Sequence, residues 1–129
     1  MITRDLEQML REEEFNEKLI AENKAPKVYT VIEKYMEEKN IQRADIIRFL
    51  NLDRTYGYQI LNGTRTPTRV HLIKIGLLLK LSLEEMQRLL KIGGKEILYA
   101  RNMTDAKTIY AIEHNLGYEN ACEFIWEEK

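Results

Sequence analysis

The hydrophobic positions of this chain recur at helical spacing from residue 28 onward. The first apolar stripe has the i, i+3, i+4, i+7 and i+8 spacing of a single helix face. Its residues are Val28, Val31, Ile32, Tyr35 and Met36. No segment shows sustained alternation of apolar and polar residues between turn dipeptides, so the sequence predicts no β-sheet. The pattern predicts an all-α fold.

A second, shorter helix and a third helix follow, joined by a tight turn. The inner face of the second is formed by Ile46, Ile47 and Leu50. The turn is Asn51-Leu52-Asp53, because Asn tolerates the left-handed conformation and Asp can accept a backbone N–H of the next helix. That next helix runs from about Arg54 to Leu61 and stops at Asn62-Gly63.

A polar loop at 64–67 leads to a fourth helix, which Pro67 and Thr68 open. This helix is apolar almost all round, which predicts that it is buried at the centre; its apolar residues are Val70, Leu72, Ile73, Ile75, Leu77, Leu78 and Leu79. Ser82-Leu83-Glu84-Glu85 matches a capping box and starts a fifth helix, which Gly93-Gly94 ends. The inner stripe of the fifth helix is predicted to be Leu83, Met86 and Leu90.

Two flanking units are predicted beside this central part. Residues 3–22 can form a helix, although Glu12 to Glu14 interrupt its apolar stripe, and Ala25-Pro26 separates it from the rest. After the double glycine, a stripe of Ile109, Ile112 and Leu116 ends at Gly117, and a last helical segment covers Tyr118 to Trp126. The predicted units are therefore an N-terminal acidic extension at 1–25, a central domain at 26–95 and a C-terminal extension at 96–129.

Charge is unevenly distributed along the 129 residues, although the net charge is only -1. Residues 40–95 hold ten Lys or Arg against four acids, whereas residues 1–25 hold seven acids against four bases and residues 96–129 hold seven against three. A basic middle between acidic ends suggests that the middle binds an anion. The alternative is that these charges only solvate helix faces.

Residues 43–62 have the length of a helix-turn-helix, the unit that places its second helix in the major groove of DNA, a groove about 12 Å wide. The predicted base contacts at the start of the third helix are Arg54, Thr55, Tyr58 and Gln59. Arg can fork onto guanine, Gln can fork onto adenine, and Thr can touch the thymine methyl group. The predicted phosphate contacts are Asn62, Thr64, Arg65 and Arg69. Each of these residues could instead be an ordinary exposed surface residue.

Several segments resemble the Cro and phage-repressor-like helix-turn-helix (XRE) regulators. Residues 41–55 look like their second helix and turn, residues 60–67 like their helix-end signature, and residues 77–90 like a later segment; the resemblance covers about residues 26–95. It implies a compact five-helix, lambda-repressor-like DNA-binding bundle, here with N-terminal and C-terminal helical extensions. It also implies sequence-specific binding to double-stranded DNA, transcription regulation in bacteria or phage, and a symmetric homodimer.

The chain departs from the family pattern at three points. The pair Gln42-Arg43 stands where the family commonly has Thr-Gln, and Arg43 can still reach a phosphate. Ile47 replaces a small residue in the second helix. Gly57 replaces an inward β-branched residue of the recognition helix, which costs about 1 kcal/mol of helix propensity and leaves space in the core. Our hypothesis from sequence is that the ring of Tyr56 or Tyr58 covers that space.

Other chemistry finds little support in the sequence. One cysteine and two histidines exclude an intramolecular disulfide framework and provide too few ligands for a structural zinc site. Catalytic motifs such as a nucleophile elbow, a phosphate-cradling glycine loop or HExxH are absent, so we expect no enzyme, cofactor or metal. Cys122 is expected to be buried, and His71 and His114 to lie at the surface. Without a signal peptide or membrane span, a cytoplasmic location is expected.

The sequence therefore predicts a DNA-binding transcriptional regulator with no small-molecule ligand. Residues 96–129 are expected to form the dimer surface or to cover the fifth helix, because their acidic balance disfavours contact with DNA. The alternative is a helical protein-interaction module, such as an adaptor or antitoxin-like partner, that has lost DNA binding. Gly57, the tyrosines and the acidic ends favour that alternative.

Overall fold

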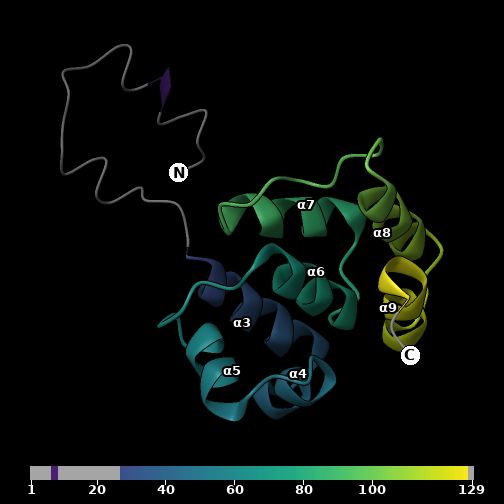
Figure 1. Cartoon of the computed structure of the whole chain (residues 1–129). Coiled ribbons are helices and arrows are strands. Elements are labelled where there is room, and N and C mark those ends of the chain that lie inside the picture. Colours follow the sequence, from purple (N-terminus) through teal and green to yellow (C-terminus); the bar gives the residue numbers. More distant parts are fainter. Residues whose placement is uncertain (1–6, 9–26, 128–129) are drawn as a thin grey trace.

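The computed structural model describes residues 7–8 and 27–127, and every regular element in those ranges is a helix (Figure 1). The helices are α3 (Val28–Lys39), α4 (Arg43–Phe49), α5 (Arg54–Leu61), α6 (Arg69–Leu78), α7 (Leu83–Ile92), α8 (Met103–Glu113) and α9 (Tyr118–Trp126). The all-α prediction is confirmed for this part of the chain. The helix predicted over residues 3–22 falls almost entirely outside it.

The helix starts lie where the polar capping residues predicted them. The side chain of Asp53 accepts a hydrogen bond from the N–H of Tyr56 (3.2 Å) at the start of α5. Thr68 accepts from the N–H of His71 (3.1 Å) at the start of α6. Ser82 and Glu85 exchange the two bonds of a capping box at the start of α7. These caps satisfy backbone donors that the first turn of a helix leaves free.

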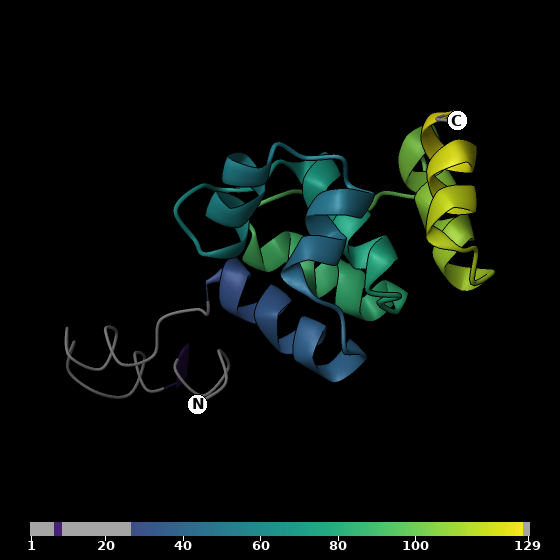
Figure 2. The ribbon, with the colours of Figure 1, turned by 90° about the horizontal axis from the view of Figure 1, so that it is seen from below.

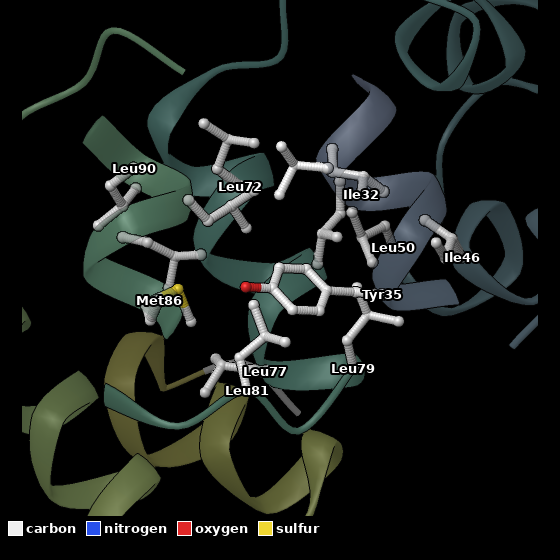
Figure 3. Packing of buried hydrophobic residues seen from close by; sticks show 14 of the residues in the cluster. Ile32, Tyr35, Ile46, Leu50, Leu72, Leu77, Leu79, Leu81, Met86 and Leu90 are labelled. Carbon is white, nitrogen blue, oxygen red and sulfur yellow. The ribbon is translucent and has the colours of Figure 1, made fainter. Parts of the chain in front are cut away.

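Helix α6 occupies the centre of the fold, with α3 and α7 packed together beside it (Figure 1). The buried residues of α6 are Leu72, Ile73, Ile75, Gly76 and Leu77, as its apolar pattern predicted. Val70 is an exception: 44% of it is exposed, because it lies in the first turn, where the helix emerges from the loop. Figure 3 shows the ring of Tyr35 from α3 lying among the leucines and Met86 of this core.

Helices α8 and α9 lie side by side at the end of the molecule away from α5 (Figure 2). Helix α9 has the predicted bounds and packs against α6. The residues of the predicted stripe, Ile109, Ile112 and Leu116, are half-buried and pack against the core, but α8 ends at Glu113, before Leu116. The most deeply buried residues of α8 are Asp105, Thr108 and Ala111, beside that stripe.

No helix in residues 7–8 and 27–127 combines the length and apolar character needed to cross a bilayer.

Candidate nucleic-acid interface

Helices α4 and α5 cross in close contact at Gly57. A Cβ atom built on Gly57 would lie 2.6 Å from Cγ1 of Ile47, so the isoleucine side chain occupies the space that a larger residue would need. Ile47 and Gly57 are both buried. The hypothesis that a tyrosine covers the glycine was therefore wrong. Ile47 fills the space that Gly57 leaves, so the large residue and the small one compensate each other.

The two tyrosines on either side of Gly57 pack elsewhere. The ring of Tyr56 lies edge-on against His71 of α6, with 5.7 Å between ring centres. Burial, and then the charge of Lys74, lower the pKa of His71, and its Nδ1 is buried without a hydrogen-bond partner. A neutral His71 thus supports the first turn of α5. Tyr58 is half-buried beneath the guanidinium of Arg54, which lies 5.8 Å from the centre of its ring.

The outward face of α5 carries the four predicted base-contacting residues. Arg54 and Thr55 are exposed, and Tyr58 and Gln59 are half-buried. Arg54 and Thr55 occupy the first turn, and Tyr58 and Gln59 follow one turn later on the same side. The structure therefore gathers them on one accessible helix face.

The loop after α5 folds back onto the end of that helix. The N–H of Thr64 donates to Oδ1 of Asn62 (2.9 Å), and Gly63 adopts a left-handed conformation with φ of 87°. Arg65 is bound to Gln59 twice: its backbone N–H donates to the carbonyl of Gln59, and its Nε donates to Oε1 of Gln59, both at 3.1 Å. The loop residues thus continue the exposed face of α5.

Arg43 lies at the start of α4, beside this face. Its Nη2 is 4.0 Å from Oε1 of Glu33, and both side chains are about half exposed (46% and 50%). An ion pair this long and this exposed contributes little to stability, so Arg43 can exchange Glu33 for another anion. The start of α4 is fixed separately, because Oδ2 of Asp45 accepts from the backbone N–H of Gln42 (3.1 Å).

Arg69, which the sequence predicts as a phosphate contact, already has partners inside the protein. Its Nη1 and Nη2 donate to Oδ1 and Oδ2 of Asp105 (3.0 and 2.9 Å), its Nε donates to the carbonyl of Glu96, and its Nη2 also reaches the carbonyl of Ile97. Four of its five donors are therefore engaged inside the protein. Arg69 ties α8 and the segment before it to the start of α6.

Asp105 is the carboxylate that binds Arg69 in this connection between α8 and α6. Burial raises the pKa of Asp105, but the hydrogen bonds from Arg69 and from the N–H of Tyr99, with the positive charge of Arg69, outweigh that effect and leave the pKa below its ordinary value. The carboxylate is therefore charged at neutral pH and forms a part-buried ion pair. Sequence reasoning missed this pair because 36 residues separate its members.

The acids nearest to α5 are already engaged with protein groups. Asp53 caps α5, and Asp45 binds Arg48 at 3.0 Å in addition to capping α4. By contrast, Arg54 and Arg65 are exposed residues with no acidic partner in the described part of the chain, and their guanidinium groups contact only Tyr58 and Gln59 among the contacts found. The exposed face of α5 therefore carries positive charge and hydrogen-bonding groups. Such a surface can bind a polyanion that also has polar edges.

Other candidate chemistry in the described ranges is sparse. No group of three or more His, Cys, Asp or Glu side chains is placed to hold a metal ion there. Cys122 is buried, as predicted. His114 ends α8 and its ring stacks on Tyr110, with 4.0 Å between ring centres.

Comparisons of the chain with protein-family models, with curated proteins and with solved structures find no significant match. The function is therefore inferred from the geometry of the site.

Proposed function

We propose that this protein binds double-stranded DNA in a sequence-specific manner through α4, the turn at 50–53 and α5, and that it regulates transcription. The carrying observation is the exposed face of α5, where Arg54, Thr55, Tyr58 and Gln59 lie together with no acidic side chain among them. A helix that projects such side chains fits the major groove, and these residue types match the donors, acceptors and methyl groups of base edges.

In this proposal the five helices α3 to α7 form a lambda-repressor-like bundle of the XRE type. Arg43 at the start of α4 and Asn62 and Thr64 in the loop contact the phosphates on either side of the groove. Because one helix-turn-helix reads too few base pairs to find a unique site, the protein acts as a symmetric dimer on two half-sites, with centres about 34 Å apart.

The test begins with selection from a pool of random duplexes, followed by fluorescence anisotropy of the selected duplex over a series of salt concentrations. We expect a palindromic motif, and an affinity whose logarithm falls linearly with the logarithm of the salt concentration. Arg54→Ala should weaken binding roughly 5- to 140-fold and remove the preference at one base position. Arg101→Ala removes the same charge from the loop before α8, away from α5 (Figure 1), and serves as the control.

One observation favours a second function, that of an interaction module without DNA binding. Large apolar side chains are exposed on the C-terminal part of the chain, at Ile97, Tyr99, Met103, Tyr110 and Phe124. A protein partner held by such contacts would bind almost independently of salt, whereas DNA binding weakens steeply. Absence of any enriched duplex at low salt would reject DNA binding and favour this module.

A further inference from the structure

We propose that Gln59 and Arg65 act as one unit that reads a guanine, with Arg65 as the contacting residue and Gln59 as the residue that positions it. This inference rests on the proposed DNA binding and specifies one base of the site. It replaces two expectations from sequence, namely that Gln59 reads adenine by itself and that Arg65 contacts only a phosphate.

The loop after α5 is anchored to that helix through Arg65 and Gln59. Two hydrogen bonds of 3.1 Å join Arg65 to Gln59, one through the backbone and one between the side chains. The bond between Asn62 and Thr64 shapes the intervening turn. A long side chain normally loses rotamer entropy when it binds a ligand, and an arginine that is already held loses less.

The same bond fixes the orientation of the Gln59 amide. Oε1 of Gln59 accepts from Nε of Arg65, which uses one of the two lone pairs of that oxygen. To read adenine, a glutamine must align its oxygen with N6 and its NH₂ with N7 at the same time, because the major-groove edge of adenine offers N7 as an acceptor and N6 as a donor. The amide of Gln59 is instead oriented by Arg65, which favours a positioning role for the glutamine.

The bond to Gln59 leaves the outer edge of the Arg65 guanidinium available. With Nε engaged, Nη1 and Nη2 of Arg65 still present two parallel N–H groups. Guanine is the base whose major-groove edge offers two neighbouring acceptors, O6 and N7. Since Gln59 belongs to the face of α5 that carries Arg54 and Thr55, its bond to Arg65 holds the guanidinium toward the base edges.

The experiment compares motifs selected from random duplexes by the wild type, Arg65→Ala, Gln59→Ala and Gln59→Glu, with Arg101→Ala as a charge-matched control. We expect a guanine at one position of each half-site that Arg65→Ala abolishes, with a loss of affinity of roughly 5- to 140-fold on the wild-type site. Gln59→Ala should weaken the preference at the same position, and the double variant should bind like Arg65→Ala alone. Gln59→Glu keeps an acceptor for Nε of Arg65. The motif that this variant selects should therefore still contain the guanine, although the variant binds DNA with a lower affinity.

A second measurement addresses the contact at the level of single atoms. Replacing that guanine by 7-deazaguanine removes the N7 acceptor, and should weaken the wild type but leave Arg65→Ala unaffected. A motif that is unchanged in Arg65→Ala, with only a uniform loss of affinity and a smaller salt dependence, would make Arg65 a phosphate contact and overturn this proposal alone. A change from adenine to cytosine in Gln59→Glu would show that Gln59 reads the base itself. Failure of the wild type to enrich any duplex would overturn the proposed function as well.

Discussion

Two pairs of helices pack against α6 and meet where Tyr118 of α9 contacts Phe49 of α4, and different contacts hold each pair in place. Helices α4 and α5 meet through a close apolar contact, in which Ile47 fills the space at Gly57. Helices α8 and α9 are held by apolar packing of Ala111, Ala121 and Ile125 and, in addition, by an ion pair between Asp105 of α8 and Arg69 at the start of α6. The outer surfaces also differ, because α5 presents polar and cationic side chains, whereas the C-terminal pair presents aromatic ones such as Tyr110 and Phe124.

This difference leaves two exposed surfaces of different chemistry on one small helical protein. A contact made of backbone and aliphatic side chain uses no polar group, so the polar residues of α4 and α5 remain available to a partner. The C-terminal pair instead buries one charged residue, Asp105, and exposes large apolar side chains beside its exposed acids. In the proposed function the first surface contacts the edges of DNA bases, and the second is the one that the alternative, a protein-interaction module, would use.

The largest predicted effect comes from breaking the charged attachment. Asp105→Ala leaves Arg69 and the N–H of Tyr99 without their acceptor, and should lower the free energy of unfolding by about 3 kcal/mol. Chemical denaturation measures this loss, and amide hydrogen exchange should show faster exchange in α8 than in α5. Glu113→Ala, an exposed acid on the same helix, is the control and should change stability by less than about 0.5 kcal/mol. A variant of Asp105 as stable as the wild type would refute the structural role given to the pair.

The second effect tests the apolar contact. Gly57→Val places a side chain where Ile47 already lies, and should lower the free energy of unfolding by about 1–3 kcal/mol through overpacking. Adding Ile47→Ala to Gly57→Val makes room for the valine where α4 and α5 cross. The double variant should therefore be more stable than the sum of the two single losses predicts. Strict additivity of the two losses would contradict the account of this contact.

The smallest effect is a difference in acid sensitivity between the two regions. Folding lowers the pKa of His71 below its ordinary value of 6.5. Above that pH the imidazole is neutral in both the folded and the unfolded protein. As the pH falls below it, the unfolded protein binds a proton at His71 before the folded protein does, which favours unfolding. Stability should therefore begin to fall below about pH 6.5. Thermal denaturation over a pH series should show that His71→Phe removes this early decline. A wild-type profile identical to that of the variant would argue against a neutral, buried imidazole.

The same series should show a second decline that belongs to the C-terminal pair. Asp105 has a lowered pKa in the folded state, so its stabilising contribution is complete above its ordinary value of 3.8 and is lost as the pH falls below that value toward the folded pKa. Asp105→Ala should lack this second decline and retain the first.

The sequence predicted the local features of the fold well. The bounds of α5 and α9, the cap at Asp53 and the capping box at Ser82 were expected from helix periodicity and capping chemistry, which involve residues within a few positions of one another. The four residues on the outer face of α5 follow from the same periodicity. The structure places them together, and their contact with DNA stays a prediction.

The features that sequence reasoning missed depend on contacts between separate elements. Ile47 and Gly57 each look unfavourable when considered alone, and only the crossing of their helices shows that they compensate. Arg69 has the sequence position of a phosphate ligand, but Asp105, far along the chain, binds it. The burial of Asp105 was also missed, because apolar periodicity finds the isoleucines of α8 that pack against the core but not a carboxylate that is buried with its partner.

The most direct test of the central claim is to map the surface that meets DNA. We would record backbone amide chemical shifts of the ¹⁵N-labelled protein before and after adding the duplex selected from a random pool. The account predicts large shifts in α5 and in loop residues 62–66, with α8 and α9 little changed. Shifts concentrated on α8 and α9, or no shifts in α5, would contradict the claim that α5 is the surface that reads DNA.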